Sequence, residues 1–336
     1  MREMKFFFLL LLSCVVVASL AAQTELPTLN RSGVPQPAGK PGGLRVLDWA
    51  GYRSALTYTF DDALRSQIEN YPKLHATGVR MTFFLTSAHQ PNPAWTKIGK
   101  DGNELGNHTA HHCHADATGC GWGGYAGSLE AEYDICSDYL KKNYGVSVVW
   151  TTATPYGDTG YDEVAKTRFF LNRGVWRGQI APEDNSDAFN LPIFGAAAGD
   201  TAEKFNPAIE SAHRSRNWLI FMFHSLGGDG GYAPVDVAEV IKSIDFARAQ
   251  GDVWIDSMVN VGAYWAGLKA VDAARVKKSG DELTYTWTLP AHFPPHHFVR
   301  ITVDGGAVRQ KGKPVAWNPA GYYEIALDAG EVTVGK

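Results

Sequence analysis

Apolar and polar positions alternate along most of the chain in patterns that predict strands and helices in turn. Continuous apolar runs at residues 55–60 and 218–223 are typical of strands that are buried on both faces of a sheet. Amphipathic helical spacing is clearest at residues 129–144 and 237–248. Because strands and helices alternate, we expect a parallel sheet or barrel from about residue 44 to residue 268.

Shorter patterns predict the other elements of this region. Further strands are expected at residues 79–85, 146–151 and 253–255, and further helices at residues 64–74, 95–100, 161–171 and after 255 up to 268. Residues 177–199 lack periodicity, so we expect them to form a loop over the face that carries the functional side chains.

The pattern changes after residue 270 to short alternating runs. Residues 283–289 and 298–303 alternate between apolar and polar side chains, and Asp304-Gly305-Gly306 is a turn signal. We therefore expect a small β-sandwich-like domain at residues 269–336. We expect this domain to be a packing partner for the barrel, with sugar binding as the alternative through four aromatic rings: Trp287, Trp317, Tyr322 and Tyr323.

The first 22 residues have the pattern of a secretory signal peptide. Arg2 and Lys5 precede an apolar run at residues 6–17, and small residues follow it. A membrane-spanning helix needs about 20 apolar residues, so this run is too short for a stable span. We expect an exported protein, secreted or periplasmic; an uncleaved N-terminal anchor is the alternative. Residues 23–43, rich in proline and glycine, are expected to form an extended lead-in.

Charge and cysteine content exclude some classes of protein. The formal net charge is −4, and no basic stripe of the kind that binds nucleic acid is present. Beyond the signal peptide, Cys113, Cys120 and Cys136 remain. We expect a Cys113–Cys120 disulfide, and we expect Cys136 to be a buried free thiol because it shares the apolar face of a predicted helix.

Ionisable side chains stand where the predicted strands end. Asp61 and Asp62 directly follow the strand at 55–60, and His108 and His112 come later in the chain. Histidines four positions apart share a face on a helical turn, so Asp62, His108 and His112 could bind one Zn²⁺ and leave a position open for water. Two more histidines of the same tract, His111 and His114, leave a shifted ligand set as the alternative.

The remaining candidate residues have roles that suit hydrolysis. Asp61 is expected to be the general base for a water whose pKa a bound cation lowers from about 16 toward about 7. His224, which follows the strand at 218–223, is the candidate general acid. The backbone amide of Tyr156 could stabilise an oxyanion. Each feature alone has an ordinary structural explanation, but their occurrence together at strand ends indicates metal-assisted hydrolysis.

Two segments resemble motifs of the polysaccharide deacetylase family (carbohydrate esterase family four), which has a NodB-like domain. They are Thr59-Phe60-Asp61-Asp62-Ala63 and His108-Thr109-Ala110-His111-His112, and the resemblance spans roughly residues 50–265. It implies an irregular (β/α) barrel, Asp61 as the base, and a site for Zn²⁺ or another divalent metal such as Co²⁺, Ni²⁺ or Mn²⁺. The metal ligands that it implies are Asp62, His108 and His112.

Later motifs of the family are altered. The Arg-x-Pro-Tyr motif stands as Ala153-Thr154-Pro155-Tyr156, so the arginine that usually orients the base is missing. Either another cation replaces it, with Arg173 and Arg177 as candidates, or the base is held differently. The Leu-x-His motif stands as Met222-Phe223-His224. The Asp-Trp motif, which would supply a carboxylate partner for His224, is not recognisable.

The resemblance implies an exported, metal-dependent hydrolase that removes N- or O-linked acetyl groups from an acetylated oligo- or polysaccharide. Because the arginine is missing and a β domain is appended, a carbohydrate-binding or cell-envelope protein with a degenerate site is the alternative. Related metal chemistry on a non-sugar amide is a third reading. A serine esterase is disfavoured, since no Gly-x-Ser-x-Gly segment occurs.

Overall fold

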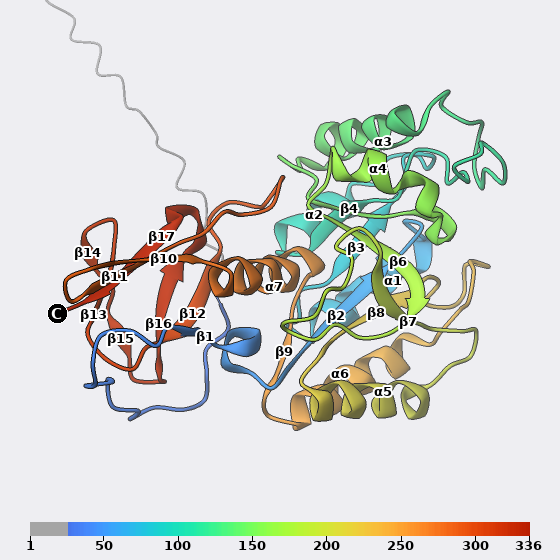
Figure 1. Ribbon diagram of the computed structural model, residues 1–336. Coiled ribbons are helices and arrows are strands. Elements are labelled where there is room, and N and C mark those ends of the chain that lie inside the picture. The colour runs from blue at the N-terminus through green and yellow to red at the C-terminus, as the bar shows by residue number, and fades with distance from the viewer. Residues whose placement is uncertain (1–25) are drawn as a thin grey trace, which may run out of the picture.

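A barrel of parallel strands forms the larger part of the protein. The computed structural model describes residues 26–336 (Figure 1). All strands of its largest sheet except β9 close into a ring in the order β3-β4-β5-β6-β7-β8-β2, because β2 pairs with both β8 and β3. The strands are β2 Ser54–Phe60, β3 Thr82–Leu85, β4 Glu104–Asn107, β5 Thr151–Ala153, β6 Leu171–Arg177, β7 Leu191–Gly195, β8 Trp218–Phe223 and β9 Val253–Ile255.

Helices cover the outside of this ring. Outward side chains of β2, such as Leu56, Tyr58 and Phe60, pack in one buried cluster with helix residues, while inward Ala55 belongs to a second cluster. Both faces of the strands are thus buried, and the predicted irregular (β/α) barrel is confirmed. The helices are α1 Arg65–His75, α2 Ala94–Lys100, α3 Leu129–Tyr144, α4 Asp162–Lys166, α5 Ala202–Ser215 and α6 Val237–Ala249, with short 3₁₀ turns η1 Asp48–Gly51, η2 Pro155–Gly157 and η3 Thr159–Tyr161.

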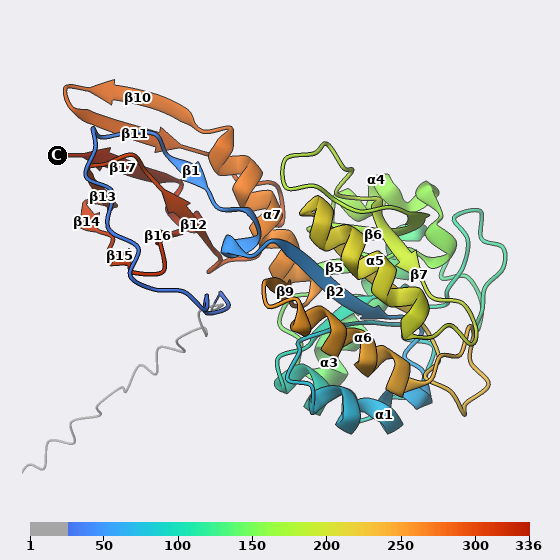
Figure 2. The ribbon, with the colours of Figure 1, turned by 90° about the horizontal axis from the view of Figure 1, so that it is seen from below.

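Helix α7 (Met258–Asp272) lies between the barrel and the C-terminal strands (Figure 2). Most of its residues are buried, as expected for a helix whose apolar residues are spread around its whole circumference. Two glycines allow close approach: a Cβ on Gly262 would lie 2.2 Å from Cδ1 of Leu171, and one on Gly267 would lie 2.4 Å from Cδ1 of Leu327. The helix therefore contacts a barrel strand through one face and the C-terminal part through the other.

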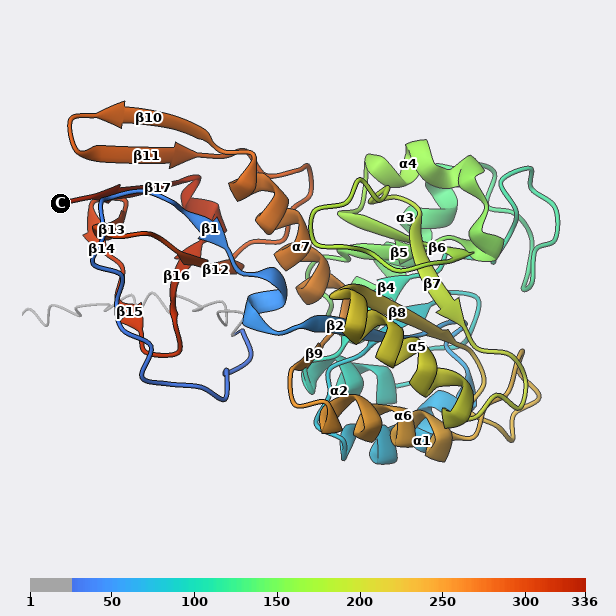
Figure 3. The same cartoon turned by 60° about the horizontal axis from the view of Figure 1, so that its bottom comes forward.

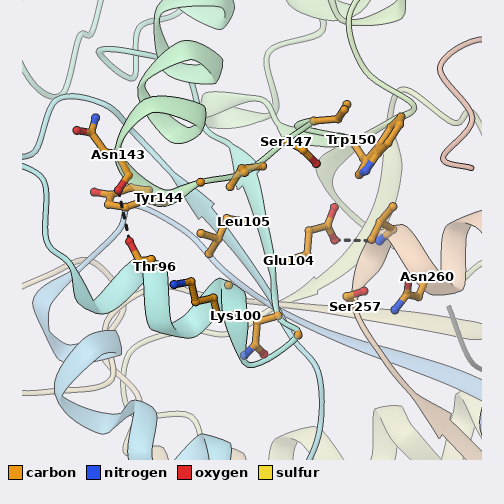
Figure 4. Close-up of a pocket in the computed structure, with 17 residues that line it drawn as sticks. Thr96, Lys100, Glu104, Leu105, Asn143, Tyr144, Ser147, Trp150, Ser257 and Asn260 are labelled. Carbon is orange, nitrogen blue, oxygen red and sulfur yellow. Dashed lines mark hydrogen bonds between the residues drawn. The ribbon is translucent and has the colours of Figure 1, made fainter. Parts of the chain in front are cut away.

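The start of α7 is capped by residues at the amino end of the barrel. Oε2 of Glu104 accepts the amide hydrogen of Val259 at 2.9 Å, and Oγ1 of Thr82 accepts that of Met258 at 2.8 Å. Figure 4 shows Glu104 at a hollow of about 510 Å³ at this end of the barrel. Burial raises the pKa of Glu104, although the hydroxyl of Thr151 also donates to it. At this end of the barrel, the side chains of Thr82 and Glu104 therefore stabilise the start of α7.

The C-terminal part consists of two antiparallel sheets that share buried side chains, including Ile301 and Val334. Three of the four rings considered for sugar binding, Trp287, Tyr322 and Tyr323, are at most 7% exposed, so they serve packing. Strand β1, before the barrel, pairs with β12 in this part. The elements are β1 Arg45–Val46, β10 Arg275–Ser279, β11 Glu282–Thr286, β12 Phe298–Thr302, β13 Ala307–Gln310, β14 Lys313–Pro314, β15 Trp317–Asn318, β16 Tyr322–Ala326, η4 Leu327–Ala329 and β17 Glu331–Gly335.

Some predicted elements are wrong. Strand β7 lies within the segment that was expected to be a loop, and its Pro192 is tolerated because the register with β6 shifts there. The sequence patterns also gave no sign of α5, whose interior contains Pro207. The strand expected at residues 146–151 begins only at Thr151, and the helix expected at 161–171 ends at Lys166. The predicted signal peptide lies outside the described residues.

Candidate active site

The predicted site residues gather at the carboxyl ends of the barrel strands. Asp61 and Asp62 follow β2, His108 follows β4, and His224 follows β8. The loops after these strands lie at the end of the barrel away from α7 and the C-terminal sheets (Figure 3). Parallel strands bring their carboxyl ends to one face, which is the usual place for catalytic side chains in such barrels.

Asp62, His108 and His112 converge on one point. Each offers one ligand atom, and these three atoms all lie within 4.8 Å of one another. Oδ1 of Asp62 is 3.3 Å from Nε2 of His108 and 3.7 Å from Nε2 of His112. His111 and His114 contact Glu132 and Asp158 instead, so the structure favours the predicted ligand set over the shifted one.

The backbone reaches this arrangement without the predicted helical turn. Residues 108–112 are irregular, and Thr109 and His112 have left-handed φ angles of 63° and 54°. The amide hydrogen of Thr109 is accepted by the side chain of Asn107, and Oγ1 of Thr109 accepts that of His112. Asp62 also has a left-handed φ, at 77°. Such strained positions are typical of functional sites.

Unpaired buried atoms show that these residues fit a divalent cation. Oδ1 of Asp62 and Nε2 of His108 are buried and have no hydrogen-bond partner among the described residues, which is rare in proteins. The carbonyl of Ala153 can only accept, so Nδ1 of His108 donates to it at 2.6 Å and Nε2 keeps its lone pair for a metal.

Although burial opposes it, the charges of Asp61 and Asp62 raise the pKa of His108. The pKa shifts of His112 and Asp62 agree with this donor set. Burial lowers the pKa of His112 to about 4, which keeps the imidazole neutral, as a metal ligand must be. Burial alone would raise the pKa of Asp62, but the adjacent imidazole of His108 lowers it to about 2. One carboxylate and two imidazoles are ligands that Zn²⁺ and similar metals accept.

Arg173 contacts the candidate base. Its guanidinium donates a hydrogen bond to Oδ2 of Asp61, and both side chains are buried. Arg177 instead lies over the ring of Phe194, 4.5 Å from its centroid. Of the two cations considered in the sequence, Arg173 is the one that pairs with Asp61. Oδ1 of Asp61 is buried and has no partner among the described residues, so one carboxylate oxygen stays available.

His224 also lies close to Asp61. Its Nε2 is 3.8 Å from Oδ2 of Asp61, while its buried Nδ1 has no hydrogen-bond partner among the described residues. Burial lowers the pKa of His224. The side chain of Gln67 donates to the carbonyls of both Asp61 and His224, at 2.6 Å and 3.0 Å. Gln67 thereby links the two loops, a role that no sequence pattern indicated.

A cleft of about 540 Å³ opens over these residues. Tyr156 lines it with a left-handed φ of 59°, and its hydroxyl donates to the carbonyl of Gly119 at 2.5 Å. The ring of Tyr156 stacks on that of His114 at a centroid distance of 3.9 Å. The other walls include Met222, from the altered Leu-x-His motif, and Trp122, Val175 and Tyr232, which no sequence pattern indicated.

Glu132, from α3, supports the loop that carries His112. Its fully buried carboxylate accepts the amide hydrogens of His111 at 2.8 Å and Ala126 at 2.9 Å. The predicted Cys113–Cys120 disulfide closes the same loop, and Cys136 is a buried free cysteine as predicted. Because Glu132 stands in an ordinary amphipathic helix, its contact with the loop had no signal in the sequence.

Comparison with known proteins gives one family match. Residues 51–168 match the model of the polysaccharide deacetylase family. This stretch contains Asp61, Tyr156 and the three candidate ligands, and it ends before Arg173 and His224. The predicted resemblance to this family is therefore confirmed. No curated protein matches the chain.

Solved structures are similar at low identity. They include a putative polysaccharide deacetylase from Mycobacterium smegmatis (14% identity, TM-score 0.46, 68% of this chain and 92% of that chain). Another is a family 4 carbohydrate esterase from Streptomyces lividans in complex with acetate (17%, 0.42, 63% and 95%). A third is the catalytic domain of a peptidoglycan N-acetylglucosamine deacetylase from Eubacterium rectale ATCC 33656 (17%, 0.40, 60% and 88%). At this level of similarity no activity is transferred to the chain.

Proposed function

We propose that this chain, whose residues 51–168 match the polysaccharide deacetylase family, is an exported, metal-dependent enzyme that removes acetyl groups from a glycan. The observation that carries the proposal is the convergence of Asp62, His108 and His112, with Asp61 beside them and paired with Arg173. This arrangement supports hydrolysis because it joins a cation site to an unliganded carboxylate.

Asp62, His108 and His112 would hold the cation, Zn²⁺ or another divalent metal. When bound, it supplies Lewis acidity and a lowered pKa for water in the cleft. Nδ1 of His108 is hydrogen-bonded to the carbonyl of Ala153, which fixes the orientation of the ring before the metal arrives. The site is thus preorganised by the chain itself.

Asp61 and His224 would divide the proton transfers. Oδ1 of Asp61 would take the proton of the attacking water, while Arg173 holds Oδ2 and with it the orientation of the carboxylate. His224 would donate a proton to the departing sugar amine or hydroxyl. Because burial lowers the pKa of His224, its protonated form is a stronger acid than an exposed imidazolium.

The cleft offers a position for the acetyl group. Met222 and Val175 give it an apolar wall, which suits the methyl of an acetyl group. The backbone amide of Tyr156 is the proposed donor to the oxyanion. An acetyl group seated in this way would present its carbonyl carbon to water next to Asp61.

Export is part of the proposal. The signal-peptide pattern of residues 1–22 motivates it, and the Cys113–Cys120 disulfide supports it because disulfides persist in oxidising compartments. Within residues 26–336, none of the helices combines the length and apolar character that crossing a bilayer requires.

The degenerate-site alternative loses its main motivation. That alternative arose because Ala153 replaces an arginine, yet Arg173 contacts Asp61 in its place. The three buried aromatic rings of the C-terminal part also remove most of the surface that sugar binding there would use.

Acetate release tests the proposed function. The protein is incubated with N-acetylated and O-acetylated glycans, before and after chelation and with Zn²⁺, Co²⁺, Ni²⁺ or Mn²⁺ restored. We expect release that chelation abolishes and that Asp61→Asn lowers by about 10²- to 10⁴-fold. Asp138→Asn, an exposed carboxylate on α3, is the matched control and should retain full activity. Release that survives both chelation and Asp61→Asn would rule out the mechanism.

A further inference from the structure

Two aromatic rings stand at the mouth of the cleft, each against a different histidine of the site. The ring of Trp122 lies 5.4 Å from that of His112, and the ring of Tyr232 lies 4.9 Å from that of His224. Both line the cavity of about 540 Å³ that contains the candidate metal site. One ring therefore borders the metal ligands and the other borders the proposed acid.

The topology separates these two rings. Trp122 belongs to the loop after β4, and Tyr232 belongs to the loop after β8. In the closed order of strands, β2 and β3 lie between them on one side and β5, β6 and β7 on the other. Trp122 and Tyr232 thus stand across the barrel mouth, with the reacting residues between them.

Both rings are held on supported backbone but remain accessible. The carbonyls of His111 and His112 accept the amide hydrogens of Trp122 and Gly121. The carbonyl of Tyr232 accepts the amide hydrogen of Ser225 at 3.1 Å. Nevertheless, the residue Tyr232 is 71% exposed, so this ring contributes little to the core.

Glycines leave space around the Tyr232 loop. An added Cβ at Gly228 or Gly230 would meet no atom within 4 Å. Asp229, between them, accepts hydrogen bonds from the amide of Gly231 and the hydroxyl of Ser225, which holds the loop in one shape. A shaped loop that presents an uncovered aromatic ring beside a catalytic cleft is typical of a binding surface.

We propose that Trp122 and Tyr232 are two sugar-stacking subsites, one on each side of the sugar whose acetyl group is removed. The proposal rests on the proposed function and adds the form of the substrate: an internal unit of an acetylated chain of at least three sugars. Pyranose rings have an apolar C–H face that packs on an aromatic ring. Two such surfaces on either side of the centre would select a chain over a single sugar.

Chain-length kinetics test the two subsites. Oligomers of N-acetylglucosamine and acetylated xylo-oligosaccharides, each of one to six units, are compared with an aryl acetate that occupies only the centre. For Trp122→Ala and Tyr232→Ala, we expect KM for oligomers of three or more units to rise about tenfold relative to KM for the aryl acetate in the same variant. Tyr232→Phe keeps the ring and should behave like the unaltered protein.

Trp176→Ala is the matched control, because Trp176 is 48% exposed but does not line the cleft. If the two alanine variants match this control at every chain length, the subsites do not exist. A parallel fall in aryl acetate hydrolysis would mean that Trp122 and Tyr232 support the site's structure instead of binding sugar.

Binding measurements separate this proposal from the proposed function. The affinity for the same oligomers is measured by calorimetry in the Asp61→Asn variant, so that the measurement does not depend on turnover. We expect tighter binding from one unit to three, and a loss of about tenfold with Trp122→Ala or Tyr232→Ala but not with Trp176→Ala. Length-dependent binding without any acetate release would keep the subsites and reject the deacetylase function. Binding that is independent of length in both series would overturn the subsites.

Discussion

Ala153 and Arg173 are register partners on the neighbouring parallel strands β5 and β6. Residues opposite each other in a parallel sheet point to the same face, and both belong to the buried interior of the barrel. The arginine that the family motif places at position 153 is thus replaced by one at the same level of the next strand. From there the guanidinium of Arg173 contacts Asp61.

This relationship predicts that an arginine at position 153 can partly replace Arg173. Arg173→Met should lower kcat/KM by about 10²-fold and cost about 3–5 kcal/mol of stability, because it leaves the Asp61 carboxylate buried and unpaired. The double variant Ala153→Arg/Arg173→Met should regain part of both. Kinetics and urea unfolding of the unaltered protein, the single variant and the double variant check this prediction. An Arg173→Met protein with unchanged kcat/KM would show that Arg173 does not orient the base.

Glu132 is expected to control metal affinity without touching the metal. Glu132→Ala leaves the amides of His111 and Ala126 without their acceptor, so the loop that carries His112 should loosen and Zn²⁺ affinity should fall about 10- to 100-fold. Competition with a chromophoric chelator measures this. Glu130→Ala, an exposed glutamate on the same helix, should leave the affinity unchanged. Equal affinities in both variants would contradict the role.

Gly267 tests how closely α7 packs on the C-terminal sheets. Gly267→Ala should destabilise the protein by about 1–2 kcal/mol, since the clash with Leu327 outweighs the gain in helix propensity. Leu327→Ala removes the clashing atoms, so the double variant should be more stable than the sum of the two single effects predicts. Thermal and urea unfolding decide it, and strict additivity would mean that the two residues do not interact.

Removal of residues 274–336 should unfold or aggregate the barrel. The buried residues of α7 form one core with Val299, Ile301 and Leu327, so truncation would expose an apolar face of that helix. Soluble yield and far-UV circular dichroism of the shortened chain provide the test. A soluble, folded barrel that loses only polymer binding would instead assign the C-terminal part to substrate capture.

Asp229 gives a pH-dependent contribution to stability. It accepts the amide hydrogen of Ser66 in the first turn of α1 and the hydroxyl hydrogen of Ser225. Although burial opposes the charge, these hydrogen bonds lower the pKa of Asp229 from 3.8 to about 2. The stabilisation is therefore fully present above about pH 4 and is lost as the pH falls through about 2.

The variant Asp229→Asn isolates this contribution. It should cost about 1 kcal/mol at pH 7, a small value because solvent screens this partly exposed group. The difference in free energy of unfolding from the unaltered protein should stay constant from pH 5 to pH 8 and shrink toward pH 2. Urea unfolding across this range measures it, and a difference that is unchanged at pH 2 would show that ionisation of Asp229 is not involved.

Long elements with strong periodicity were predicted well from the sequence. The boundaries of α3 (Leu129–Tyr144) and β8 (Trp218–Phe223) agree with the expected ranges, because a single apolar pattern specifies each. β4 (Glu104–Asn107) and β6 (Leu171–Arg177) were not predicted, and β7 and α5 were missed because Pro192 and Pro207 interrupt their patterns. Register shifts and neighbouring strands compensate for such interruptions, and neither can be seen locally in the sequence.

The sequence by itself determined the residue types of the site and their order along the chain, placed Asp61, Asp62 and His224 after strands, and favoured the disulfide between Cys113 and Cys120. It did so because local periodicity and short spacings carry that information. Only the tertiary structure decided that Arg173 is the partner of Asp61, that Glu132 supports the histidine loop, and that Trp122 and Tyr232 face one cleft. These contacts depend on the register of parallel strands and on loops that meet across the barrel mouth, which no local pattern encodes.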